Sequence, residues 1–191
     1  MSSHAAPSLD VLLQSFLLYG ILPAWVVFGF IDYLCHRASK IEENTGLRES
    51  LLHSVMGVQI GLPIFLGLFL EVNVLLMLIM LAVLVQHEYV AHLDVKFAYG
   101  ARPLAIWELH AHSFLEAIPF VIFGLVALLK WPAFMDLVTL RWAGHLSLSP
   151  KAVPLSGGFI RGYMVLMLLL GFVPYTEELA RCLRARRNRN A

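Results

Sequence analysis

Acidic residues and histidines recur four residues apart at four places in the chain. The pairs are Asp32–His36, Glu49–His53, Glu88–His92 and Glu108–His112. Residues four apart share one face of an α-helix, so each pair directs a carboxylate and an imidazole the same way. These two groups are common protein ligands of iron, manganese and zinc. The spacing therefore predicts metal binding by side chains carried on helices.

Three further candidates lie next to these pairs. His87 precedes Glu88, His110 lies two residues before His112, and Glu116 follows His112 by one helical turn. One ion needs three or four protein ligands, so this set would serve two adjacent ions, or one ion with supporting carboxylates. The predicted ligand set is Asp32, His36, Glu49, His53, His87, Glu88, His92, Glu108, His110, His112 and Glu116.

Long apolar segments must position these residues. Hydrophobic residues make up 59% of the 191 residues and charged residues only 14%, whereas about a quarter of a soluble domain is charged. A membrane-spanning helix needs about 20 apolar residues. We therefore predict an all-α, polytopic membrane bundle in one domain, with four long spans and a shorter fifth, followed by a basic tail at 176–191. The spans are 11–34, 51–70, 72–92, 112–131 and 159–175.

The basic residues predict the orientation of this bundle. If the spans alternate in direction, ten of the 14 Lys and Arg residues lie on one side of the membrane and four on the other. An excess of Lys and Arg marks the cytoplasmic side, so the N-terminus is expected outside and the C-terminus in the cytoplasm. All the predicted ligands then fall at the cytoplasmic ends of the helices. His4 and His145 fall on the outer side, without an acidic partner at the repeated spacing.

In these elements the chain resembles the histidine-rich integral-membrane di-iron family of fatty acid hydroxylases, fatty acid desaturases and sterol desaturases. The matching elements are Asp32-Tyr-Leu-Cys-His36, His53, the H-x-x-x-x-H spacing of His87 and His92, and His110-Ala-His112. Unlike the boxes of that family, this chain has no adjacent His-His pair. The resemblance implies two iron ions that use dioxygen to hydroxylate or desaturate a lipid-like aliphatic substrate drawn from the bilayer.

Glu116 and Glu49 are the expected catalytic carboxylates, which would bridge the ions or relay protons. No flavin or nicotinamide fingerprint such as G-x-G-x-x-G is present, so electrons would come from an external donor. Zinc or manganese stays open in place of iron. A zinc-dependent hydrolase of membrane lipids and a metal- or haem-binding accessory subunit of a membrane complex also stay open. The net charge of +1 gives no indication of nucleic-acid binding, and the oligomeric state is left open.

Overall fold

The computed structural model describes residues 6–142 and 146–190, which are mostly helical, with a longer non-helical stretch at residues 146–156. Within those two ranges there is no β-strand, only an isolated bridge between Leu70 and Pro150, so the all-α prediction is confirmed for this part of the chain. Five helical segments of the described residues are long and apolar enough to cross a membrane. They are Leu9–Ser39, Leu47–Phe69, Val74–Ala101, Ile106–Leu129 and Gly157–Arg189.

The first and fifth segments each contain a π-helical turn. The first consists of α1 (Leu9–Phe16), the π-helix η1 (Leu17–Ile21) and α2 (Leu22–Ser39). The fifth consists of α7 (Gly157–Leu166), the π-helix η3 (Met167–Phe172) and α8 (Val173–Arg189). Hydroxyl groups of Ser8 and Ser156 accept hydrogen bonds from the first turns of α1 and α7 and so fix where each segment begins.

The helices between them are continuous and run past the predicted limits of the spans at the end that carries the ionisable residues. They are α3 (Leu47–Phe69), α4 (Val74–Ala101) and α5 (Ile106–Leu129). We expected residues 93–111 to connect two spans, but only residues 102–105 do. Likewise, the predicted tail at 176–191 is helical as far as Arg189. The apolar pattern stops where ionisable residues begin, yet the helices continue because many of those residues are buried in the bundle.

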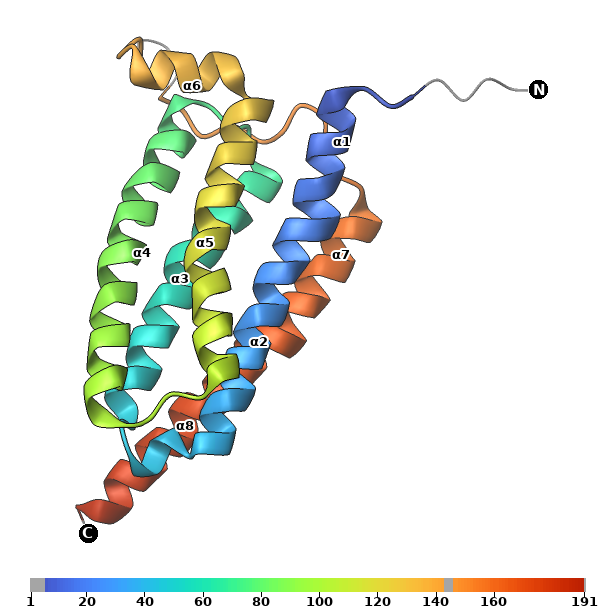
Figure 1. Cartoon of the computed structure of the whole chain (residues 1–191). Coiled ribbons are helices and arrows are strands. Elements are labelled where there is room, and N and C mark those ends of the chain that lie inside the picture. Colours follow the sequence, from blue (N-terminus) through green and yellow to red (C-terminus); the bar gives the residue numbers. More distant parts are fainter. Residues whose placement is uncertain (1–5, 143–145, 191) are drawn as a thin grey trace.

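Short turns bring the helix halves that carry the predicted ligands to one end of the molecule (Figure 1). Between α2 and α3 the chain forms a single 3-10 turn, η2 (Ile41–Glu43), and then reverses at Gly46. Gly46 has a φ of 61°, a conformation that suits glycine. The ends of α2 and α4 therefore lie beside the starts of α3 and α5. A short helix, α6 (Trp131–Val138), follows α5 at the opposite end.

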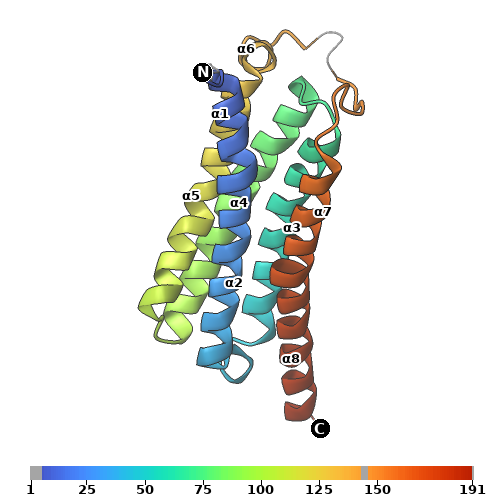
Figure 2. The same ribbon diagram turned by 90° about the vertical axis from the view of Figure 1, so that its right-hand side faces the viewer.

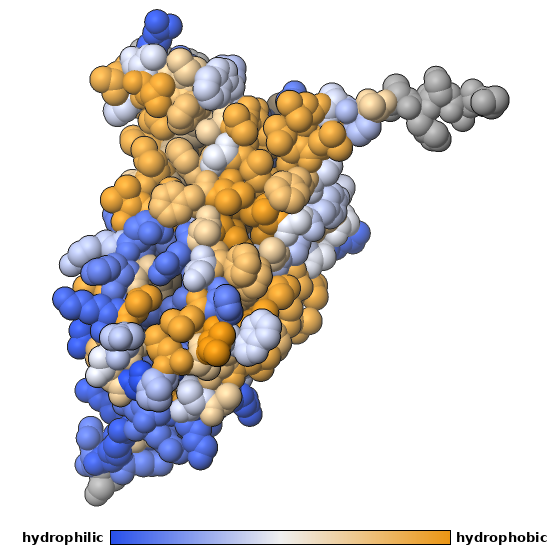
Figure 3. All heavy atoms as spheres, viewed as in Figure 1, coloured by the Kyte–Doolittle hydropathy of each residue, from blue (hydrophilic) through white to orange (hydrophobic). Residues whose placement is uncertain are grey.

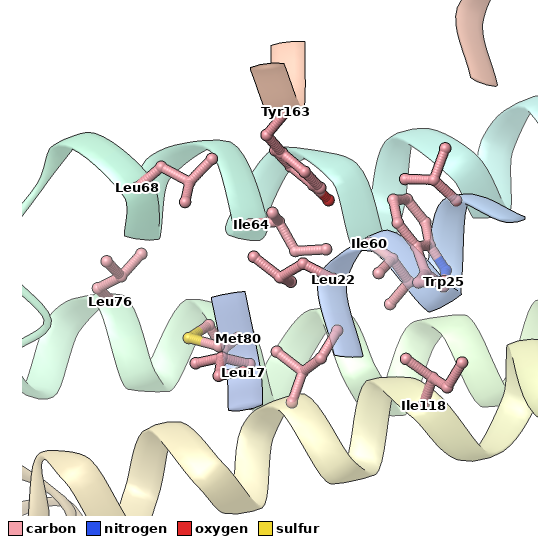
Figure 4. Close-up of a cluster of buried hydrophobic side chains, with 12 residues drawn as sticks. Leu17, Leu22, Trp25, Ile60, Ile64, Leu68, Leu76, Met80, Ile118 and Tyr163 are labelled. Atoms are coloured by element: carbon pink, nitrogen blue, oxygen red, sulfur yellow. The ribbon is translucent and has the colours of Figure 1, made fainter. Parts of the chain in front are cut away.

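Apolar side chains from most of these segments form the core. Leu22 and Trp25 of α2 pack with Ile60 of α3, Met80 of α4 and Ile118 of α5 (Figure 4). The helix formed by α7, η3 and α8 lies alongside α3 (Figure 2) and also contacts α2. Packing of this apolar cluster fixes the helix directions. It thereby determines which polar side chains meet where α2 and α4 end and α3 and α5 begin.

The outer surface is strongly apolar. Between 11% and 39% of the residues in the apolar window of each candidate span are buried inside the molecule, so most of these apolar residues face outward. Figure 3 shows apolar residues over the upper and middle part of one face and hydrophilic residues toward the lower end. Because a soluble monomer seldom exposes so large an apolar surface, this distribution suits a protein surrounded by lipid.

Candidate metal centre

Ionisable side chains from five helices and one loop meet in the interior of the bundle. All of them are buried except His112, whose side chain is 12% exposed. The acids and imidazoles come from the last turns of α2, the first turns of α3 and α5, the C-terminal half of α4, and α8. They are Asp32, His36, Glu49, His53, Asp94, Arg102, Glu108, His112 and Glu178.

Asp32 lies at the centre of a first group with three histidines. Its Oδ1 is 3.0 Å from Nε2 of His112 and 3.6 Å from Nε2 of His36, and its Oδ2 is 4.0 Å from Nδ1 of His53. One ligand atom of each residue lies within 4.8 Å of the other three. Atoms bound about 2.0–2.2 Å from a common ion are themselves roughly 3–4 Å apart. The group can therefore hold a metal ion.

The free atoms of this group support that fit. Asp32 Oδ1, His36 Nε2, His53 Nδ1 and His112 Nε2 are buried and have no hydrogen-bond partner among the described residues. Asp32 Oδ1 and His112 Nε2 lie 3.0 Å apart and form an ion pair when His112 is protonated. Buried polar atoms are nearly always paired, and four such atoms around one point match the donor set of a bound cation.

Two buried carboxylates hold the histidines in orientation. Glu178 Oε2 lies 3.0 Å from Nδ1 of His36, and Asp94 Oδ2 lies 2.9 Å from Nε2 of His53. A carboxylate that accepts a hydrogen bond from the N–H of one ring nitrogen leaves the other nitrogen free as a ligand. The pairing therefore presents Nε2 of His36 and Nδ1 of His53 to the first group.

A second group combines His36 with Glu49 and Glu108. The Nε2 atom of His36 is 3.7 Å from Oε1 of Glu49 and 3.6 Å from Oε1 of Glu108, and this group also has the spacing of metal ligands. Since His36 belongs to both groups, the two groups are adjacent.

Arg102 binds both acids of the second group. Its Nη2 donates to Glu49 at 2.7 Å and also to Glu108, while its Nη1 donates to Glu108 at 3.0 Å. Burial alone would lower the pKa of Arg102, but the hydrogen bonds and negative charges of Glu108 and Glu49 raise it. The guanidinium is therefore a permanent positive charge in the interior.

A cavity of about 560 Å³ reaches the first group from the apolar part of the bundle. Asp32, His53, Asp94 and His112 form its polar end, and its walls are largely apolar side chains such as Trp25, Met56, Leu115 and Met167. Val58, Leu168 and Phe172 also line it and are 66%, 50% and 67% exposed, so the cavity borders the outer surface between α3 and η3. Its size is that of a small-molecule site.

The other predicted ligands lie apart from these two groups. His92 and His110 are exposed, Glu88 and Glu116 are half-buried, and His87 is buried against the cavity. Successive residues of a helix are about 100° apart, so spacings of five and two residues turn His92 away from His87 and His110 away from His112. His4 and His145 lie outside the described residues. The structure thus brings together six of the predicted ligands: Asp32, His36, Glu49, His53, Glu108 and His112.

Asp94, Arg102 and Glu178 are part of the cluster but absent from the predicted set. Asp94 is seven residues after His87, on the buried stripe that also holds Ala91 and Ala98, and this two-turn spacing was a usable signal. Glu178 lies between buried Pro174 and Cys182, each four residues away. No family model, curated protein or solved structure matches this chain.

Proposed function

We propose that this chain is a membrane-bound non-haem oxidoreductase that holds two iron ions and uses dioxygen to hydroxylate or desaturate a lipid-like aliphatic substrate. One observation carries the proposal. A buried cluster of imidazoles and carboxylates forms the end of a largely apolar cavity, and that cavity borders a surface suited to contact with lipid. An aliphatic chain could reach the cluster without passing through water.

The charges of the cluster support two divalent ions. Metal-ligating histidines are neutral, and in that state the five carboxylates and one guanidinium leave four negative charges in the interior, where uncompensated charge is costly. Two divalent cations would balance them. Asp32, His53 and His112 would hold one ion, and His36, Glu49 and Glu108 would hold the other. Iron is proposed because the mixed imidazole and carboxylate donors suit it and because of the family resemblance.

Iron bound here would supply the activation of dioxygen. The chain itself would bind and orient the substrate along the apolar wall and exclude water from the reacting position. Asp94 and Glu178 would keep His53 and His36 in the required tautomers. Glu116 lines the cavity one turn from His112, and Glu49 is one of the cluster acids; in this proposal they carry protons to and from the reacting position. An external donor supplies electrons.

We infer the orientation from the basic residues. Arg184, Arg186, Arg187 and Arg189 occupy the end of α8 that follows Glu178. An excess of arginine favours the cytoplasmic side, so the cluster would lie in the cytoplasmic half of the bilayer, with the N-terminus outside. An electron donor in the cytoplasm could then reach it.

Metal analysis of detergent-purified protein tests the proposal. We expect about two irons per chain, without the Soret absorption of haem, and oxidised lipid products when dioxygen and a reductant are supplied. His53→Ala and His112→Ala should strip metal, whereas His92→Ala and His110→Ala, at exposed positions of the same helices as cluster residues, should not. Equal metal content in all four variants, or purified protein that takes up no iron, would refute the proposal.

A zinc-dependent lipid hydrolase is the second candidate. The observation that favours it is the arrangement of three imidazoles around one point, since three histidines and a water form a common catalytic zinc site. In that case the ion would be zinc, the protein would be colourless, and the products would be free acids from lipid esters or amides. The same metal analysis separates the two candidates.

A further inference from the structure

His87 is a polar side chain of the cavity that the metal cluster does not use. It comes from α4, is 4% exposed, and lines the cavity, yet neither ring nitrogen makes a well-aligned hydrogen bond to any described residue. An imidazole has two ring nitrogens, and the main chain of Leu115 is near enough to serve only one of them. The other is buried without a partner, which is costly, so the position indicates a ligand that supplies the missing hydrogen bond.

The neighbouring helix leaves one ring nitrogen of His87 for that ligand. The main chain of Leu115 on α5 interacts with His87, and the carbonyl of Leu115 lacks its usual helical donor because residue 119 is proline. A neutral imidazole has one donor nitrogen and one acceptor nitrogen. If the donor faces this carbonyl, the acceptor is left for a group that can donate a hydrogen bond.

The distance from His87 to the cluster follows from the helix that carries it. Asp94, at the polar end of the cavity, lies seven residues further along α4, and a rise of 1.5 Å per residue separates the two by about 10 Å along the helix. A ligand that contacts both His87 and the cluster therefore has a polar group beside His87 and an aliphatic stretch of about 10 Å between that group and the cluster.

We propose that the cavity binds an aliphatic molecule bearing a neutral hydroxyl group, and that His87 is the hydrogen-bond partner of that hydroxyl. A hydroxyl both donates and accepts, so it suits either tautomer of His87. A carboxylate would instead enter a cavity that already contains the acid Glu116 and would lose its hydration there. The proposed function assigns this cavity to the substrate, and the inference rests on that proposal only in naming the chemical class of the substrate.

Trp25 lines the cavity and can report binding by its fluorescence. The protein for this test is metal-free, reconstituted in phosphatidylcholine nanodiscs, and has Trp25 as its sole tryptophan through Trp107→Phe, Trp131→Phe and Trp142→Phe. Its emission is titrated with ω-bromododecanol and with bromododecane, two quenchers that differ only in the hydroxyl. We expect the alcohol to reach half-maximal quenching at an about two- to tenfold lower concentration, the effect of one hydrogen bond.

Variants assign this preference to His87 and to the cavity. His87→Leu should remove the preference and leave quenching by bromododecane unchanged, whereas His87→Gln should retain it. A Cβ atom added at Gly57 or Gly124 meets no other atom within 4 Å, but of these two positions only Gly57 lines the cavity. Gly57→Leu should therefore fill the cavity and weaken quenching by both probes, and Gly124→Leu is the matched control.

Equal quenching by the two probes, a preference that persists in His87→Leu, or the absence of quenching by either probe would overturn the inference. Thermal unfolding of each variant checks that it is folded. Because the titration uses metal-free protein, its outcome is independent of whether iron binds. A failed iron analysis with an intact hydroxyl preference would count against the proposed function alone, and the reverse result against this inference alone.

Discussion

Arg102→Met should destabilise the protein more than any change of an exposed arginine. The side chain of Arg102 is 4% exposed, and it pairs with Glu49 and Glu108, which are fully buried. Removing one partner of a buried ion pair costs about 3–5 kcal/mol, because the remaining charge has neither water nor a counter-charge. At about 2–4 °C per kcal/mol for a chain of this size, the melting temperature should fall by about 6–20 °C.

Thermal unfolding in detergent, followed by circular dichroism, measures this shift in metal-free protein. Arg37→Met is the control, since Arg37 is 60% exposed and lies 3.7 Å from Glu177, which is itself 39% exposed. Screening by water makes such a pair weak. The double variant Arg102→Met/Glu108→Gln should regain part of the loss, because one unpaired charge is removed. An Arg102→Met shift no larger than that of Arg37→Met would refute the assignment of Arg102 as the counter-charge of these acids.

Two further predictions concern a supporting carboxylate and an exposed turn. Glu178→Gln should lower metal affinity about 10- to 100-fold by loosening His36, as measured by metal titration, whereas Glu177→Gln, one residue away, should have little effect. The backbone N–H of Ala152, 2.8 Å from Glu71, and the charge of Lys130 lower the pKa of Glu71 from its ordinary 4.5. Glu71 therefore stabilises the folded protein fully above its ordinary pKa of 4.5. That stabilisation is lost as the pH falls through the lowered pKa that Glu71 has in the folded protein. Melting temperatures taken from about pH 6 to about pH 3 should fall less steeply for Glu71→Gln; identical pH dependence would show that this contact does not contribute.

Much of the architecture could be predicted from local features of the sequence. The apolar segments are long and almost free of charge, so their helical nature and number follow from length and composition. The four-residue spacing of Asp32–His36, Glu49–His53 and Glu108–His112 fixes a shared helix face before any tertiary contact is known. These pairs account for all six predicted ligands that the structure brings together.

The rest of the candidate site could not be predicted, because it depends on contacts between helices that are distant in sequence. Glu88–His92 has the same spacing as the other pairs, but His92 is exposed because the buried face of α4 follows His87, Ala91 and Asp94 instead. Arg102 counted only as one positive charge among many, since its role depends on acids from α3 and α5. Glu178 lay beyond the apolar part of the fifth span, and nothing local linked it to the first span.

The hydrogen bond between His36 and Glu178 joins residues 142 positions apart, and this separation has a consequence for biosynthesis. A ribosome that adds about 5–20 residues per second needs about 7–28 s to make the intervening chain. During that interval His36 and Asp32 have been synthesised while the last helix does not yet exist. The buried cluster can therefore be completed only late in synthesis, after the helix that carries Glu178 has been made.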